Sequence, residues 1–467
     1  MTDSGREPGS FRDPATRVFY ADGRVFRGRD ATAADDWVAL SATTFFPTLL
    51  AEGKAVGTRS VELTEVPGGP PGEFAAVLEH DRIPFVSYPY EWSFEMLRDA
   101  ALLHLEILVA ALGEDVTMKD GYAFNVQWEG RQPVFIDIGS FEALRGGGPW
   151  IGYRQFCQTF LYPLMLEAHL GIPFQRYLLG HLDGLEPTEM RRMFSGRKRF
   201  KKGVFRHVFL HSVAESRVTQ GGTALKDEMG KAGFGKELTL ATVKKLHKLI
   251  GKLRSKRSES GWKQYRETCS YSDADRVAKE QFIRTAVEGT QPKLSWDLGC
   301  NDGVYARMLA ERGGTVVAVD SDDVTVDALY RSLRAEGPDN VLPLVMDLVD
   351  PSPARGWRNE ERRAFTGRGQ PDLVLALALV HHLAIAANVP LAEVVSWFRS
   401  LDATLIVEFV APHDPMAAQL LGNKPVGMFD DYRADVFEGL LEAQFTVTRR
   451  EDLPGGSRTL YLAVPRS

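Results

Sequence analysis

The sequence predicts an α/β protein in which a doubly wound parallel sheet at the C-terminus follows an N-terminal α+β domain. From Leu294 onward, apolar strand-like runs alternate with helix-like stretches, which is typical of a parallel sheet covered on both faces. The formal charge also changes sign twice: it is −12 over residues 1–190, +14 over 191–260 and −8 over 261–467. We therefore expect one domain at 1–195, a basic helical connector at 196–260 and a second domain at 261–467.

Each expected strand of the C-terminal sheet is apolar over nearly its whole length, and helices separate most of the strands. The strands are Leu294–Leu298, Thr315–Asp320, Val341–Met346, Asp372–Val380 and Ala403–Val410, and the helices are Val304–Arg312, Asp323–Ala335 and Leu391–Ser400. A helix at Tyr432–Ala443 and two strands, Phe445–Arg449 and Arg458–Val464, around a Pro-Gly-Gly turn then predict a terminal antiparallel hairpin.

Composition is that of a soluble globular protein, with 44% hydrophobic and 25% charged residues among 467. The N-terminus is charged and has no apolar core, so we expect no signal peptide. The longest clean apolar run, Leu373–Val380, is too short to span a membrane. Three scattered cysteines form no CxxC pair, which favours a cytoplasmic location without disulfides or structural zinc.

The loop after the first strand resembles the cofactor motif of class I methyltransferases, which use S-adenosylmethionine. Glycines at such a loop let the backbone approach a ligand closely. A nicotinamide-binding loop would need G-x-G-x-x-G, and Asn301 and Val304 occupy its second and third glycine positions. The terminal hairpin is another feature of the methyltransferase class. The resemblance places Asp297, Gly299, Asn301 and Gly303 at the cofactor.

Two aspartates at strand ends extend this resemblance. Asp320 ends the second strand, and its carboxylate can accept hydrogen bonds from both ribose hydroxyls. Asp347 follows the third strand, where it can accept the adenine amino group. The alternative is that both side chains only cap loops, as Asp often does after strands. Together the four features predict S-adenosylmethionine as cofactor and methyl transfer as the reaction.

His381 and His382 are candidate catalytic residues at the end of the fourth strand. Ligands of open α/β sheets bind at that edge, and methyl transfer to oxygen or nitrogen often requires removal of a proton. A histidine pKa of about 6.5 suits a general base. Alternation along a strand would point the two rings to opposite sides. The other interpretation is that one of them is structural.

Glu408 is a third candidate, because it interrupts an apolar strand at its carboxyl end. A buried carboxylate is costly unless it is paired. Its partner is expected to be either a substrate group, which would make Glu408 catalytic, or a neighbouring arginine.

The N-terminal domain contains a pattern that resembles protein kinases and small-molecule phosphotransferases. A helix is predicted over Ser93–Leu112, with Ser93 as N-cap. Asp120 and Asn125 follow with D-x-x-x-x-N spacing, and a hairpin then leads to Asp137-Ile-Gly. By this resemblance Asp120 would be the base, and Asn125 and Asp137 would be magnesium ligands of a nucleotide site.

Two parts of a kinase are missing from the sequence. No G-x-G-x-x-G loop precedes the helix, and Lys54, the only lysine among the first 118 residues, follows a helix-like stretch. We therefore expect a degenerate kinase-like domain that binds substrate or nucleotide, with weak or no phosphotransfer. The alternative is an unrelated helix and hairpin in which Asp120 and Asp137 pair with nearby Arg or Lys.

As a whole the chain resembles a family of bacterial methyltransferase-related proteins, some of which are called nodulation proteins. The resembling segments are Tyr88–Phe94, Lys119–Phe141, Trp150–Leu164 and Ser295–Ser467. The resemblance implies use of S-adenosylmethionine and a glycan or small-molecule acceptor, and it does not identify the acceptor atom.

The basic stretch at residues 191–260 could contact a polyanion, so the alternative function within the enzyme class is an RNA methyltransferase. A kinase-like binding module that recruits substrate is the alternative from another class. Few aromatic residues interleave the charges, and the plainer interpretation is a solvated connector that rests on the acidic domains. His207 and His211 lack a third ligand, so we expect no metal site.

Overall fold

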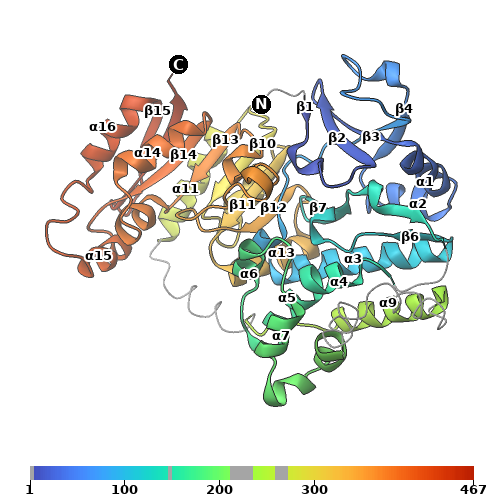
Figure 1. The fold of residues 1–467 in the computed structure, drawn as a ribbon. Coiled ribbons are helices and arrows are strands. Elements are labelled where there is room, and N and C mark those ends of the chain that lie inside the picture. Colours follow the sequence, from blue (N-terminus) through green and yellow to red (C-terminus); the bar gives the residue numbers. More distant parts are fainter. Residues whose placement is uncertain (1–4, 146–149, 211–234, 258–271, 467) are drawn as a thin grey trace. The chain divides into compact units, whose positions relative to one another are not determined.

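The computed structural model describes residues 5–145, 150–210, 235–257 and 272–466 (Figure 1). The chain divides into two compact units. Unit 1 comprises residues 1–128, 133–257 and 354–363, and unit 2 comprises residues 129–132, 258–353 and 364–467. The boundary near residue 258 lies close to the expected one at 261. Residues 354–363 were expected in the C-terminal domain but belong to unit 1, where Glu361 pairs with Arg12 (Nε to Oε1, 2.6 Å).

Unit 1 begins with a five-stranded antiparallel sheet in the order β1-β2-β3-β5-β4. Asp22 and Gly23, both with positive φ, form the tight turn between β2 and β3. One face of the sheet packs its own apolar cluster, which includes Phe19, Phe26 and Val77. The strands are β1 (Gly5–Arg6), β2 (Thr16–Ala21), β3 (Arg24–Arg29), β4 (Thr58–Val61) and β5 (Ala76–His80).

The rest of unit 1 is mainly helical. The expected helix at Ser93–Leu112 is present as α3 (Phe94–Gly113), and the Ser93 side chain accepts a hydrogen bond from the Met96 backbone as its N-cap. The expected hairpin is also present as β7 and β8. The elements are α1 (Ala31–Ser41), α2 (Phe45–Ala51), β6 (Val116–Met118), β7 (Val126–Glu129), β8 (Gln132–Phe135), β9 (Phe141–Ala143), α4 (Tyr153–Phe156), α5 (Tyr162–Leu170), α6 (Gln175–Gly180) and α7 (Pro187–Met193).

The basic stretch is not a separate connector, because its described part belongs to unit 1. Helix α9 (Lys236–Ile250) buries Val243 and Leu246, so its apolar stripe is part of a core rather than solvated. Its Lys236 pairs with Asp115 (2.6 Å). Residues 211–234 and 258–260 of the expected connector, including His211, lie outside the described residues.

Unit 2 contains a seven-stranded sheet in the order β12-β11-β10-β13-β14-β16-β15. The first five strands in this order are parallel, and β16 runs antiparallel to both β14 and β15. The expected parallel sheet with a terminal antiparallel hairpin is therefore confirmed. The strands are β10 (Leu294–Leu298), β11 (Thr315–Asp320), β12 (Val341–Val345), β13 (Leu373–Ala376), β14 (Thr404–Val410), β15 (Phe445–Asp452) and β16 (Arg458–Pro465).

The helices of unit 2 follow the expected alternation. They are α11 (Asp273–Ala286), α12 (Val304–Ala310), α13 (Asp323–Glu336), α14 (Leu391–Ser400), α15 (Pro415–Gly422) and α16 (Ala434–Gln444). One strand differs: the run expected at Asp372–Val380 ends at Ala376, because Ala378 has φ 50° and turns the chain out of the sheet. Within the described parts of the chain, no helix is both long and apolar enough to cross a membrane.

Candidate active site

The loop after β10 adopts the close turn that its glycines predict. Gly299, Asn301 and Gly303 all have positive φ, and Gly303 is the N-cap residue of α12. An added Cβ at Gly303 would lie 2.5 Å from the Leu329 side chain of α13, which would have to move, and the φ of 74° is itself strained for any other residue. At Gly299 an added Cβ would make an ordinary contact with Leu379 (3.7 Å), so the positive φ, rather than packing, calls for glycine here.

Asp297, the penultimate residue of β10, is a buried carboxylate that is 2% exposed. Its Oδ2 has no hydrogen-bond partner within the described residues. Burial raises the pKa of Asp297 to about 7, although nearby Lys279 acts in the opposite direction. A buried carboxylate with a free oxygen favours a ligand that brings a positive charge or a donor.

Asp320 lies at the end of the neighbouring strand β11. The backbone N–H of Asn301 donates to its Oδ2 (3.0 Å), and the N–H of Asp322 donates to its Oδ1 (3.0 Å). Each oxygen keeps a further lone pair for a hydroxyl group. Burial raises the pKa of Asp320. The side chain thus caps loops, as the plainer interpretation expected, and still presents acceptor oxygens beside the glycine loop.

Asp347 lies after β12 and is exposed. Its Oδ1 accepts a hydrogen bond from the Val349 backbone (2.9 Å), which is a loop-capping contact. The backbone N–H of Met346 donates to the Asp320 carbonyl oxygen (2.8 Å). The end of β12 therefore lies next to the end of β11, and Asp347 follows directly.

His381 and His382 do not lie on a strand, since β13 ends five residues earlier and a helical turn begins at this point. Their ring centroids are 4.2 Å apart. His381 is buried, and burial lowers its pKa to about 3. Its Nδ1 has no hydrogen-bond partner in the described structure. His382 is exposed. Of the two rings, His382 is the one that solvent or an acceptor can reach.

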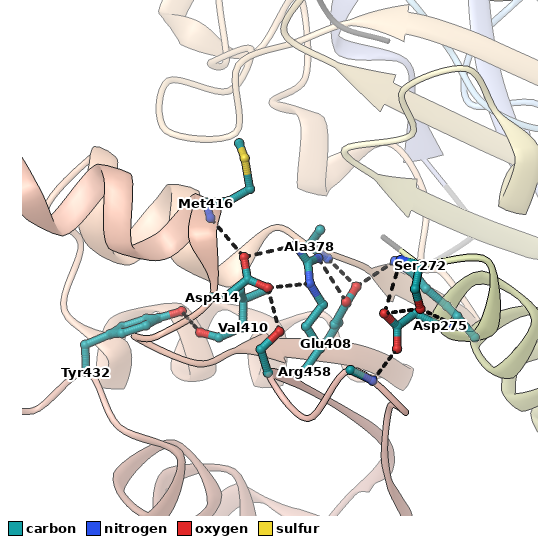
Figure 2. A network of polar contacts seen from close by, with 12 residues as sticks. Ser272, Asp275, Ala378, Glu408, Val410, Asp414, Met416, Tyr432 and Arg458 are labelled. Atoms are coloured by element: carbon teal, nitrogen blue, oxygen red, sulfur yellow. Dashed lines mark hydrogen bonds and ion pairs between the residues drawn. The ribbon is translucent and has the colours of Figure 1, made fainter. Parts of the chain in front are cut away.

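Glu408 on β14 is fully buried and lies in a polar network (Figure 2). Its Oε2 is 2.6 Å from Lys279 Nζ and accepts the backbone N–H of Ala378 (2.9 Å). Arg458 Nη1 donates to its Oε1 (3.3 Å). Glu408 was expected to pair with either a substrate group or an arginine. In the structure it pairs with Arg458 and also with Lys279. The bond to Ala378 also holds the turn that leads to the two histidines.

Asp414 completes the network on the far side of Arg458. Its Oδ2 is 2.9 Å from Arg458 Nε, and the Ser457 hydroxyl donates to the same oxygen (2.8 Å). Lys279 and Arg458 could not be predicted as partners because they lie 129 and 50 residues from Glu408 along the chain. Asp414 joins the network only through Arg458 and Ser457. A Lys in the otherwise apolar stripe of α11 was the signal that could have found Lys279.

The three residues of the expected nucleotide site in unit 1, Asp120, Asn125 and Asp137, lie close in sequence to the paired strands β6 and β9. The Lys119 backbone donates to the Ser140 carbonyl (2.9 Å), which places Asp120 near the turn that contains Asp137. Burial, and then the charge of Asp137, raises the pKa of Asp120 to about 6. Asp137 pairs with Arg27 of β3 (2.9 Å). The Nδ2 of Asn125 is buried and has no partner among the described groups.

Lys54 does not take the place of a strand lysine. It follows α2, and its Nζ pairs with Glu52 (2.9 Å). No group of three or more His, Cys, Asp or Glu side chains in the described residues could hold a metal ion.

No family model matches the chain. It is 35% identical over 461 residues to nodulation protein NoeA of Rhizobium meliloti, which covers 98% of this chain and 95% of NoeA. The chain belongs to the NoeA family. A shorter similarity, 25% identical over 138 residues, links this NoeA-family protein to the O-antigen chain terminator bifunctional methyltransferase/kinase WbdD of Escherichia coli. It covers 29% of this chain and 18% of WbdD.

Among solved structures, the N-methyltransferase NodS of Bradyrhizobium japonicum is 14% identical, with a TM-score of 0.31 over 42% of this chain and all of NodS. In the NoeA-family protein itself, unit 2 has the five parallel strands, terminal hairpin and glycine loop of the class I methyltransferases. Unit 2 thus has a methyltransferase-like fold.

Proposed function

We propose that this protein transfers the methyl group of S-adenosylmethionine to a glycan or another small-molecule acceptor. The observation that carries the proposal is the group formed by Asp297, the positive-φ loop at Gly299 and Asp320, at the carboxyl ends of β10 and β11. Ligands of open α/β sheets bind at this edge. The name of WbdD, an O-antigen chain terminator, supports a glycan acceptor.

The residues at this edge fit the proposed donor. S-adenosylmethionine carries a positive sulfonium and an ammonium group, and the free Oδ2 of buried Asp297 can receive positive charge. Asp320 offers two acceptor oxygens for the ribose, and Asp347 follows at the next strand end for the adenine. The Asn301 backbone is fixed by Asp320, so the loop is held in place before any ligand binds.

The protein's contribution to the reaction is alignment and proton removal. Bound at the β10 loop, the donor supplies an activated methyl group. The loop and Asp320 hold it in one orientation, which converts a bimolecular step into an effectively unimolecular one. His382 follows the turn that Glu408 anchors through Ala378, and in this proposal it accepts the proton of an acceptor hydroxyl or amine.

Replacement of Asp320 by alanine should weaken binding of S-adenosylhomocysteine about ten- to a hundred-fold. The loss of a charged acceptor for two hydroxyl groups costs roughly 1.5–3 kcal/mol. Isothermal titration calorimetry measures the affinity. Asp273→Ala, at an exposed position of α11, is the control and should bind like wild type. Equal affinity in Asp320→Ala, or no binding to the wild type, would contradict the proposed donor.

Affinity for S-adenosylhomocysteine should fall as the pH drops through about 7. Because the pKa of Asp297 is raised to about 7, its carboxyl becomes neutral below that pH and no longer attracts the ligand ammonium. Between pH 8 and pH 6 the ionised fraction falls about tenfold, and the affinity should follow. The stability of the ligand-free protein depends on pH in the opposite direction. The contribution of Asp297 to the free energy of unfolding is fully present below about pH 4 and is lost as the pH rises through about 7. Asp297→Asn should bind with little pH dependence; an equally steep profile in that variant would contradict this role.

We propose a second function for unit 1, the binding of a nucleotide by a degenerate kinase-like domain. Three features support it: the five-stranded antiparallel sheet followed by a long helix, the β6–β9 pairing that brings Asp120 near Asp137, and the unpartnered Nδ2 of Asn125. The raised pKa of Asp120 also suits a group that accepts a proton near neutral pH. Lys236 of the basic stretch pairs with Asp115 of unit 1, so this cation is already engaged by a protein carboxylate.

A further inference from the structure

Strand β3 carries a buried arginine for which the methyltransferase reaction has no use. Arg29 is 1% exposed, and its Nε and Nη1 make no hydrogen bond within the described part of the chain. Its pKa is lowered to about 10, mainly by burial and then by the charge of Arg27. Because a buried guanidinium is costly without partners, the position calls for an anion that the protein does not itself supply.

The neighbours of Arg29 are already paired with one another. Arg27 Nη1 donates to Asp137 Oδ1 (2.9 Å), and Lys119 Nζ donates to Asp13 Oδ2 (3.0 Å). Asp137, and then Asp36 and Asp13, attract Arg29 through space, yet none of the three forms an ion pair with it. Asp36 instead pairs with Arg145 (3.3 Å). The protein carboxylates that could neutralise Arg29 are thus held by other cations.

Alternation along β3 gives Arg27 and Arg29 a common face. Phe26, which directly precedes Arg27, points to the opposite face of the sheet and packs into the apolar cluster there. The Arg27 side chain reaches Asp137 and lies close to Gly139, where an added Cβ would be 2.7 Å from its Nη1. The two guanidinium groups therefore lie on the side of the sheet that contains the Asp120–Asp137 pair.

We propose that Arg29, with Arg27 beside it, binds a phosphoryl group in unit 1. The inference rests on the proposed nucleotide-binding function of unit 1 and names the cation that the sequence pattern lacked at Lys54. A planar guanidinium donates two parallel hydrogen bonds to phosphate oxygens, and an arginine keeps its charge in a buried position better than a lysine does. The phosphoryl group is the anionic end of a nucleoside triphosphate or a free polyphosphate.

The test measures binding of ATP with magnesium, and of tripolyphosphate, to the full-length protein by calorimetry and thermal shift. Wild type should bind at least one of these compounds, and Arg29→Met should bind it at least about tenfold more weakly. Arg29→Lys should bind more weakly than wild type but more tightly than Arg29→Met, because a lysine offers a charge without two parallel donors. Arg24→Met is the matched control on the same strand, because Arg24 pairs with Glu79. Without ligand, Arg29→Met should melt at the same temperature as wild type or higher, since it removes an uncompensated buried charge.

The outcomes separate this inference from the proposals on which it stands. Binding of ATP with equal affinity to wild type and Arg29→Met overturns the role of Arg29 and leaves the nucleotide proposal intact. Binding of tripolyphosphate that depends on Arg29, with no preference for ATP, supports the phosphoryl site and overturns the nucleotide proposal. No binding of either compound to wild type overturns the inference. Affinity for S-adenosylhomocysteine, measured on the same samples, reports on the methyltransferase proposal independently.

Discussion

Replacement of Glu408 by glutamine should lower the free energy of unfolding of unit 2 by about 3–5 kcal/mol. In the wild type the Glu408 carboxylate, 2.6 Å from Lys279 Nζ, compensates the charge of the lysine. In the variant the buried ammonium faces only a neutral amide. Burial already lowers the pKa of Lys279, so the lysine should lose its proton in the variant. Denaturant titration, followed through the transition that S-adenosylhomocysteine protects, measures the loss.

Two further variants show whether the buried charge is the cause. Asp402→Asn removes one partner of an exposed ion pair with Arg399 and should change stability by less than about 1 kcal/mol. The double variant Lys279→Met with Glu408→Gln removes both members of the buried contact and should be more stable than Glu408→Gln alone. A Glu408→Gln protein as stable as wild type would instead return Glu408 to the list of substrate-binding candidates.

The parallel sheet could be predicted from the sequence because burial on both faces leaves a local signal. Each strand from β10 to β14 is a short, nearly continuous apolar run, and such runs need no knowledge of their neighbours to be recognised. The terminal hairpin has a local signal as well, in the Pro-Gly-Gly turn before β16. The end of β13 has none. Ala378 leaves the strand through a hydrogen bond to Glu408, thirty residues away, and no pattern near Ala378 records that contact.

Among the candidate site residues, too, some have a local sequence signal and others depend on contacts between distant parts of the chain. The glycine loop and Asp320 follow strand ends directly, so their positions could be predicted, whereas the partners of Glu408 depend on tertiary packing. In unit 1 the cations lie on β3 instead of at a strand lysine, because Arg27 and Arg29 alternate there with Phe26 and Gly28. Charged residues at every second position of a strand were the signal for a polar, functional face. The separate connector was wrong because charge alone did not show that α9 has an apolar stripe.

Replacement of His382 by alanine should slow methyl transfer by roughly 10²–10⁴-fold while affinity for S-adenosylhomocysteine stays nearly unchanged. His382 is exposed at the end of the turn that Glu408 anchors, so an acceptor can reach it. His381 is a poor base, because burial lowers its pKa to about 3, and His381→Ala should mainly affect stability. The rate of methyl incorporation from labelled donor into glycans of the source organism measures the effect.

The exposed His413, in the loop after β14, provides the control, and His413→Ala should retain full activity. The pH profile adds a second criterion. A base must be neutral to accept a proton, and desolvation lowers the pKa of His382, so wild-type turnover should fall at a lower pH than an ordinary histidine would give. If both His381→Ala and His382→Ala keep wild-type turnover, neither ring removes a proton. Catalysis would then rest on the alignment that the β10 loop and Asp320 impose on donor and acceptor.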